Sequence, residues 1–174
     1  MERKKMVAIY QAQTKEDIEH ARELFYEFLT WAIEESKELY NVDIDINEMV
    51  DRSMAEIEKG LFSPPHGRLL LAKDEEQIIG IGCLKTIRKG TGEVKRMYVR
   101  PDHRGKKIGQ KLLKQLIRSA KEMGCSRVLL DSARFMKSAH ALYRSAGFKE
   151  VDLYSETEMT EHFQDHMIYM ELEL

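Results

Sequence analysis

The stretch RPDHRGKKIGQKLL, residues 100–113, joins a glycine-containing turn to the start of an amphipathic helix. It carries five positive charges and two glycines, although the whole chain has a net charge of −2. Two explanations fit this concentration of charge, a bound anion or a solvated basic face. The N–H groups at the start of a helix lack acceptors within it, and the helix dipole is positive there. A phosphate is therefore a natural ligand, although the nucleotide-binding patterns GxxxxGK[ST] and GxGxxG are both absent.

Regular elements are predicted on both sides of this turn. Residues 93–99 form the strand that leads into it, and Pro101 ends that strand. A helix follows, with apolar residues at helical spacing up to Met123 and Gly124 as its C-terminal stop. Further helices are expected to begin at Thr14 and Asp45. The remaining predicted segments are strands at 6–10, 68–72, 78–84, 127–131, 148–154 and 168–174, and a short helix at 139–146.

The order of these elements sets the expected fold class. Strand 68–72 is a continuous apolar run, so it should be buried on both faces, whereas the last strand alternates apolar and charged residues and should have one solvated face. Antiparallel hairpins come first and a β–α–β crossover comes later. The chain is therefore expected to be one α/β (α+β) domain over residues 1–174. Its central sheet should be mixed, mostly antiparallel, with six to seven strands flanked by about four helices.

Composition excludes several classes of protein. The 174 residues are 43% apolar and 33% charged with both signs mixed, which is typical of a soluble globular protein. The slightly acidic balance argues against general nucleic-acid binding. No apolar run approaches the roughly 20 residues that span a bilayer, and no signal peptide is evident, so a cytoplasmic location is expected. Cys83 and Cys125 lie far apart without CxxC spacing, so reduced thiols and no metal site are predicted.

Three segments together carry a resemblance to a known family. EVKRMYVRPDHRGKKIGQKLL, RVLLDSA and AHALYRSAGF resemble motifs of the GNAT superfamily of acyl-CoA-dependent N-acetyltransferases, and its small bacterial members above all. The motifs cover residues 93–154, and the element order extends the resemblance to nearly the whole chain. It implies the GNAT fold, acetyl-CoA as co-substrate and a small amine as the other partner, with no nucleic acid, membrane or metal.

The resemblance assigns cofactor contacts to the loop and to the strand before it. In the family an [RQ]-x-x-G-x-[GA] loop binds the pyrophosphate of acetyl-CoA, and the strand backbone pairs with the pantetheine. The matching residues are Met97, Tyr98, Val99, Arg104, Gly105, Lys106, Lys107, Ile108 and Gly109. Lys107 stands where the family usually has glycine, so the backbone angle there must not be one reserved for glycine. Met136 replaces an asparagine that contacts the cofactor in many relatives, and Ser138 is the candidate substitute.

Amide formation needs a neutral amine and a protonated leaving thiolate. Glu93 occupies the position at which some family members place a general base, and the bland alternative is a surface glutamate beside a turn. Tyr143, just before a helix-ending glycine, matches the family's general acid. His140 lies one helical turn away and is expected to be a half-exposed surface residue.

The acceptor site is less constrained by the sequence. On an extended strand Lys95 points to the same side as Glu93, so it is a candidate to hold a substrate carboxylate; a solvated lysine is the alternative. Because the two N-terminal helices usually cover the acceptor site in this family, Trp31 and Tyr40 are candidate lining residues. The acceptor itself is expected to be a primary amine of a small molecule or an amino acid.

Other functions stay open at this stage. Neither cysteine lies at the expected reaction centre, so direct attack in a ternary complex is predicted rather than an acetyl-enzyme. The alternatives are a non-catalytic acyl-CoA-binding regulatory module and an acetyltransferase that acts on a protein or peptide amine. A homodimer is a further possibility, since the alternating last strand could pair with that of a second copy.

Overall fold

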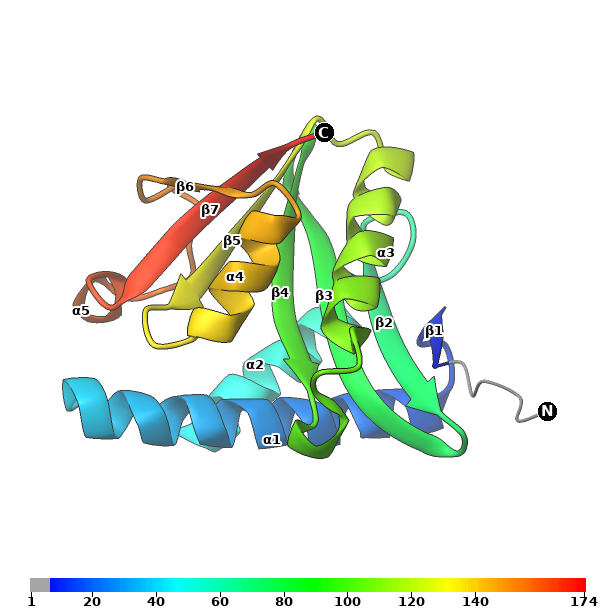
Figure 1. Cartoon of the computed structure of the whole chain (residues 1–174), viewed down its shortest axis with the longest axis horizontal. Coiled ribbons are helices and arrows are strands. Elements are labelled where there is room, and N and C mark those ends of the chain that lie inside the picture. Colours follow the sequence, from blue (N-terminus) through cyan, green and yellow to red (C-terminus); the bar gives the residue numbers. More distant parts are fainter. Residues whose placement is uncertain (1–6) are drawn as a thin grey trace.

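The centre of the molecule is a twisted seven-stranded sheet in a computed structural model that describes residues 7–174 (Figure 1). Its strands lie in the order β1-β2-β3-β4-β5-β7-β6, and only β4 and β5 pair in parallel. The strands are β1 (Ala8–Gln11), β2 (Gly67–Asp74), β3 (Gln77–Arg88), β4 (Thr91–Val99), β5 (Arg127–Ala133), β6 (Lys149–Val151) and β7 (Met167–Glu173). The mixed, mostly antiparallel sheet is confirmed; residue 6, where the first strand was expected to begin, lies outside the described residues.

Helices cover both faces of this sheet. The helical segments are α1 (Lys15–Tyr40), α2 (Ile46–Glu58), η1 (Pro101–His103), α3 (Ile108–Glu122), α4 (Lys137–Ser145) and α5 (Glu161–Gln164). In Figure 1, α3 and α4 lie in front of the sheet and α1 crosses it near the ends of β3 and β4. The predicted helix starts are confirmed. Thr14 and Asp17 form a complete capping box, and the Asp45 side chain accepts from the Glu48 N–H at 3.1 Å.

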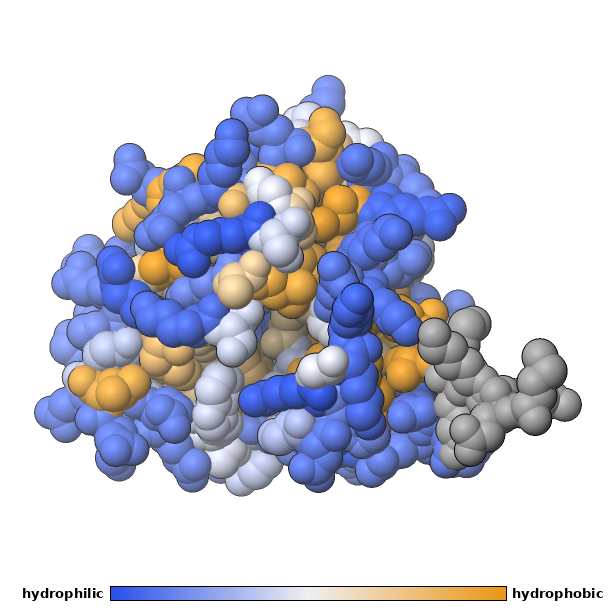
Figure 2. Space-filling view, viewed as in Figure 1, coloured by the Kyte–Doolittle hydropathy of each residue, from blue (hydrophilic) through white to orange (hydrophobic). Residues whose placement is uncertain are grey.

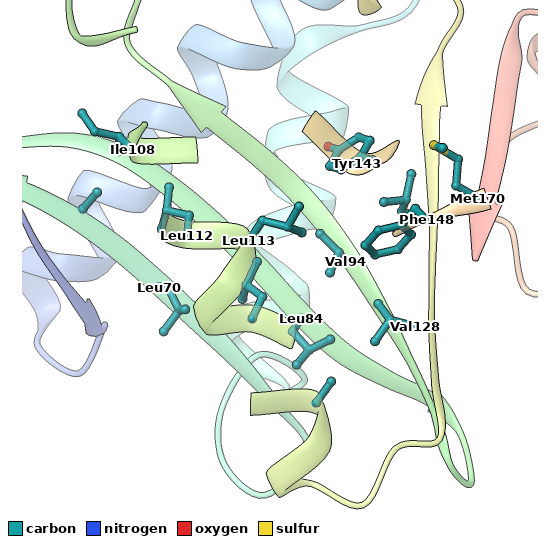
Figure 3. Close-up of a cluster of buried hydrophobic side chains, with 14 of the residues drawn as sticks. Leu70, Leu84, Val94, Ile108, Leu112, Leu113, Val128, Tyr143, Phe148 and Met170 are labelled. Carbon is teal, nitrogen blue, oxygen red and sulfur yellow. The ribbon is translucent and has the colours of Figure 1, made fainter. Parts of the chain in front are cut away.

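Apolar clusters cover both faces of the sheet, as the continuous apolar run in β2 predicts. Leu70 and Ala72 face the core under α3 and α4, whereas Leu69 and Leu71 face the core under α1 and α2. Figure 3 shows the first core, where Leu112 and Leu113 of α3 pack over the strands. Burial of leucine side chains on this scale stabilises a fold by about 1.5–3 kcal/mol each before conformational entropy is subtracted.

The strand that leads to the loop is interrupted by a bulge. Ile81 of β3 pairs with Tyr98 and Cys83 pairs with Lys95, so Gly82 faces both Arg96 and Met97. Arg96 adopts a left-handed backbone, with φ of 54°. A Cβ at Gly82 would lie 3.0 Å from Leu116 and 3.1 Å from the Met97 sulfur, which explains the glycine at this position.

β4 and β5 pair only at their beginnings. Their register runs from Thr91 opposite Arg127 to Glu93 opposite Leu129 and then stops. Beyond it the two strands diverge toward α1 (Figure 1). From Val94 onward, the edge of β4 that faces β5 therefore has no strand partner.

Three features differ from the expected pattern. The short helix α5 was not predicted, and β6 spans only 149–151 instead of 148–154. The predicted solvated face of the last strand is wrong for its first half, because Met167 to Met170 are all buried. β7 lies between β5 and β6, with one core cluster on each side of the sheet. Both cysteines are free and buried, as expected, and no helix within residues 7–174 has the length and apolar character to cross a membrane.

Candidate active site

One cavity of about 710 Å³ opens where β4 and β5 separate. It extends from the loop before α3, past β4 and α4, to the side chains of α1 and α2 on the other side of the sheet. Figure 2 shows hydrophobic residues between α3 and α4, in the middle of a face that is otherwise mostly hydrophilic. The cavity therefore connects the basic loop to an apolar chamber through the gap in the sheet.

The loop presents a row of free backbone donors. Within the described residues, no backbone N–H from Gly105 to Gln110 donates a hydrogen bond, and no side chain caps the start of α3. Lys107 has φ of 61° and ψ of 21°, in the left-handed region that favours glycine but admits other residues, so the angle is not one reserved for glycine. The lysine adopts it at a cost of about 1 kcal/mol. The helix start, the free N–H groups and the positive side chains together fit a bridged diphosphate.

The side chains of the loop differ in their contacts and in their access to the cavity. Arg104 donates from Nε to the Val99 carbonyl at 2.9 Å, and its guanidinium lies 5.7 Å from the ring centroids of both Trp31 and Tyr98. It thereby links the loop to α1. Lys106 is exposed and does not line the cavity, whereas the side chain of Ile108 is buried in the core. At Ile108 only the backbone is therefore available to a ligand.

The free edge of β4 forms one wall of the cavity. Met97, Tyr98 and Val99 all line it. Their side chains pack into the two cores, Met97 and Val99 on the α3 side and Tyr98 on the α1 side. The backbone is thus the part of these residues that can pair with an extended ligand, as β-strand addition requires.

Tyr143 of α4 faces the cavity with its hydroxyl unused. The residue is buried beside Phe148, and within the described chain its hydroxyl makes no hydrogen bond (Figure 3). Burial, assisted by the charge of Asp131, raises the pKa of Tyr143. It therefore stays a neutral phenol that can donate a proton. Ser138 and Met136 also line this end, so the serine is available in place of the family's asparagine.

Glu93 lies behind the cavity wall. It is 0% exposed and does not line the cavity. Its Oε1 accepts from the Tyr154 hydroxyl at 2.8 Å, and its Oε2 is 3.8 Å from Lys95 Nζ. Burial raises the pKa of Glu93 above its usual value, although the charge of Lys95 opposes this. The alternative of a surface glutamate is wrong, and the residue has no direct access to an acceptor amine.

Lys95 lines the cavity but is already paired with carboxylates. Its ammonium donates to Glu158, which also accepts from Lys85, and Lys85 pairs with Glu56 of α2 at 2.9 Å. The prediction that Lys95 shares a side of the strand with Glu93 is confirmed by their contact. A substrate carboxylate would have to displace Glu158 to reach Lys95.

The carboxylate that does line the cavity is Asp131, which the sequence reasoning missed. It follows the buried residues Val128 to Leu130 of β5 and accepts a hydrogen bond from the Thr157 hydroxyl at 3.3 Å. Burial raises the pKa of Asp131 above its usual value, although Lys95 and Arg96 oppose the shift. The signal was present in the sequence as the single acidic residue at the end of the apolar run RVLLD.

Aromatic and methionine side chains form the chamber on the α1 side. Trp31 lines it and meets Phe135 edge to face, with 5.6 Å between ring centroids. Tyr40 does not line the cavity: it stacks on His166 at 4.1 Å, so its predicted place in the lining is corrected. The remaining apolar side chains of this chamber are Phe28, Leu29, Ala32, Ile33, Ile44, Met49, Met136, Met159, Phe163 and Met167.

The predicted exposure of His140 is also corrected. It is 2% exposed rather than half-exposed, because α4 packs its inner face on β5, and its Nε2 lies 3.1 Å from the Ser132 hydroxyl. Burial lowers the pKa of His140, so it is neutral near pH 7. Among residues 7–174, no group of three or more histidine, cysteine, aspartate and glutamate side chains is placed to hold a metal ion.

Comparison with known proteins agrees with this geometry. Residues 25–148 match the model of the Acetyltransferase (GNAT) family. An uncharacterised N-acetyltransferase of Schizosaccharomyces pombe is 31% identical over 145 residues, which are 82% of this chain and 84% of that protein. The resemblance inferred from the motifs is therefore confirmed.

Solved structures share the fold over nearly the whole length. An acetyltransferase from Streptococcus agalactiae superimposes with a TM-score of 0.75 at 18% identity, covering 97% of this chain and 98% of that one. PaiA N-acetyltransferase from Thermoplasma acidophilum, in complex with coenzyme A, gives 0.74 at 23% identity, covering 97% and 99%. The family match, the relative and the shared fold together show that this chain belongs to the Acetyltransferase (GNAT) family and is an N-acetyltransferase of the GNAT type.

Proposed function

We propose that this enzyme transfers an acetyl group from acetyl-CoA to the primary amine of a small molecule or amino acid, by direct attack in a ternary complex. The observation that carries the proposal is a continuous cavity. The free N–H groups of the loop line one end of it, and Tyr143 and Asp131 face the interior. Donor and acceptor can therefore meet in one enclosed space.

The proposed acetyl-CoA site follows the cavity from the loop to the gap in the sheet. The N–H groups from Gly105 to Gln110 and the charges of Arg104 and Lys107 would hold the pyrophosphate. Gly109 lets α3 approach α4, since a Cβ there would lie 3.3 Å from Leu142. The unpaired edge of β4 would hold the pantetheine by backbone hydrogen bonds. The thioester would then lie between β4 and β5, beside Tyr143.

Two proton transfers complete the reaction. Tyr143 donates its proton to the departing thiolate, since it lines the cavity and its hydroxyl has no other partner among the described residues. Asp131 accepts the proton of the incoming ammonium, because it is the carboxylate in the cavity lining and burial raises its pKa toward neutral pH. Glu93, the base suggested by the sequence, would act only through Lys95 or water.

Direct attack is favoured over an acetyl-enzyme. Burial raises the pKa of the Cys83 thiol to about 12, and neither cysteine lines the cavity. A thiolate nucleophile is therefore absent from the described part of the site. Initial-rate plots at varied amine and acetyl-CoA should intersect, and parallel lines would overturn the ternary complex.

The experiment that tests the function is an amine panel incubated with acetyl-CoA, with release of free thiol as the readout. Tyr143→Phe should lower kcat by about 10²–10⁴-fold with little change in acetyl-CoA affinity, because only the hydroxyl is lost. Thiol release that does not depend on any amine would overturn N-acetyl transfer to a small molecule. Binding of acetyl-CoA without turnover of small or peptide amines would favour the non-catalytic module instead.

A further inference from the structure

The bulge in β4 places two consecutive cationic side chains on the acceptor side of the sheet. In a regular strand Lys95 and Arg96 would point to opposite faces. Because the strand has an extra residue opposite Gly82, Arg96 turns to the same face as Lys95. Its Nε donates to the Ser53 hydroxyl of α2 at 3.0 Å. The next side chain, that of Met97, points to the opposite face and packs against the core under α3.

Of these two cations, Arg96 is the one that has no carboxylate partner among the described residues. Lys95 is held by Glu158 and lies 3.8 Å from Glu93. The bond from Nε to Ser53 is the one hydrogen bond that Arg96 makes with the described residues, so its terminal nitrogens are unused. The residue is half-buried and lines the cavity.

The guanidinium is also fixed in orientation. The Ser53 hydroxyl that accepts from Nε donates in turn to the Met49 carbonyl at 3.0 Å, so the guanidinium is held from the helix side. The left-handed backbone at Arg96 is strained for a residue other than glycine, and ligand sites often contain strain of this kind. The two terminal nitrogens then present the paired N–H groups that match a planar carboxylate.

The residues around Arg96 indicate which other chemical groups the ligand has. Asp131, across the cavity on β5, interacts electrostatically with Arg96 but forms no hydrogen bond with it. Between the two strands and α1 the walls are apolar, with Phe28, Trp31 and Phe135 among them. Among the described residues the chamber thus offers a cation without a carboxylate partner, the carboxylate of Asp131 and apolar walls.

We propose that Arg96 binds a carboxylate of the acceptor, so that the preferred substrates are amino acids with apolar side chains. This inference rests on the proposed N-acetyltransferase function and names its substrate class. Asp131 faces the amino group, Arg96 the carboxylate, and the aromatic and methionine walls contact the side chain. Methionine side chains adapt to different shapes, so several apolar side chains are accepted. The binding of a substrate carboxylate, which the sequence predicted for Lys95, is thus assigned to Arg96.

The test compares amino acids with their decarboxylated amines. Leucine and 3-methylbutylamine form one pair, and phenylalanine and phenethylamine form another. Wild-type enzyme should have a kcat/KM at least tenfold higher for each amino acid. Arg96→Gln should raise the KM of the amino acids about 10- to 100-fold, the range for loss of a charged hydrogen bond, and change that of the amines less than threefold. Arg96→Lys should recover part of the loss.

Controls separate this outcome from a general defect. Arg118→Gln is the matched variant, because Arg118 is exposed on α3 and, among the described residues, pairs only with Glu122. It should change the KM of neither the amino acids nor the amines, and acetyl-CoA affinity should be equal in all variants. Equal turnover of amino acids and amines, or equal effects of Arg96→Gln on both, overturns the inference while leaving the proposed function intact.

Failure of the proposed function can be distinguished from failure of the inference about Arg96. If no amine is acetylated, the proposed function fails, and calorimetry with leucine and the protein–CoA complex tests Arg96 directly. Binding of leucine that Arg96→Gln abolishes supports the carboxylate site. Absence of binding, or binding that the substitution leaves unchanged, overturns it.

Discussion

At the scale of single residues, two carboxylates on adjacent strands differ in access to the cavity. Glu93 is sealed against Tyr154, whereas Asp131 lines the cavity. Burial raises the pKa of both, so the direction of the shift does not select the base. Access does, because a base must come within hydrogen-bonding distance of the proton it removes.

Substitution of these two residues should separate their roles. Asp131→Asn should lower kcat/KM by about 10²–10⁴-fold near neutral pH. Because a base acts in its ionised form, wild-type kcat/KM should fall as the pH drops toward the raised pKa of Asp131, and the variant should lack this decline. Higher pH should partly rescue it by deprotonating the amine in solution. Glu93→Gln should cost less than tenfold; a larger loss than that of Asp131→Asn would make Glu93 the base.

At the scale of elements, the loop and α3 together form the proposed anion-binding unit. Lys107 ends the loop in a left-handed conformation, and α3 begins immediately after it without a side-chain cap. The lysine adds a positive charge near the free N–H groups at the cost of backbone strain. If Lys107 binds the cofactor phosphates as proposed, stability and cofactor affinity are opposed at this position.

Lys107→Gly should separate the two contributions. Glycine adopts the left-handed angle freely, so the free energy of unfolding should rise by up to about 1 kcal/mol. Acetyl-CoA affinity should fall about 2- to 10-fold, as expected for one partly solvated charge contact with phosphate. Thermal unfolding and calorimetric titration measure the two effects. Lys121→Ala, in the last turn of α3, is the control and should change neither by a comparable amount; a tighter complex in Lys107→Gly would contradict the charge contribution.

At the scale of the whole molecule, one ionic network joins α2, β3, β4 and the segment before α5. Lys85 and Lys95 share Glu158, Lys85 also pairs with Glu56, and Glu93 lies beside Lys95. Burial alone would raise the pKa of Glu158, but Lys95 and Lys85 lower it far below its usual value of 4.5. The network thus ties the segment 152–160 to the back of the active site.

Its contribution to stability should depend on pH with a definite sign. The folded state holds the Glu158 proton more weakly than the unfolded state does, so the stabilisation is complete above about pH 4.5 and is lost as the pH falls further. Glu158→Gln should lower the free energy of unfolding by about 1–3 kcal/mol at pH 7, or roughly 2–4 °C in Tm per kcal/mol. The difference from wild type should shrink between pH 5 and pH 3, as measured by thermal unfolding; a constant difference would mean that ionisation of Glu158 is not the cause.

The sequence by itself determined the features that depend on neighbours in the chain. Apolar periodicity, the capping residues at Thr14 and Asp45, and the glycine-containing turn before α3 act over a few residues, so the elements, the fold class and the anion-binding loop could be predicted. The family motifs lie in the same local segments, which is why Tyr143 could be placed from them.

Only the tertiary structure decided which charged side chains face the cavity. Side chains alternate along a strand, and one bulged residue moves Arg96 to the opposite face. That bulge depends on Gly82 in the neighbouring strand, and the engagement of Lys95 depends on Glu158, 63 residues away. Asp131 reaches the cavity because β4 and β5 part after three paired residues. These contacts join residues that are far apart in the sequence, so local sequence patterns do not predict them.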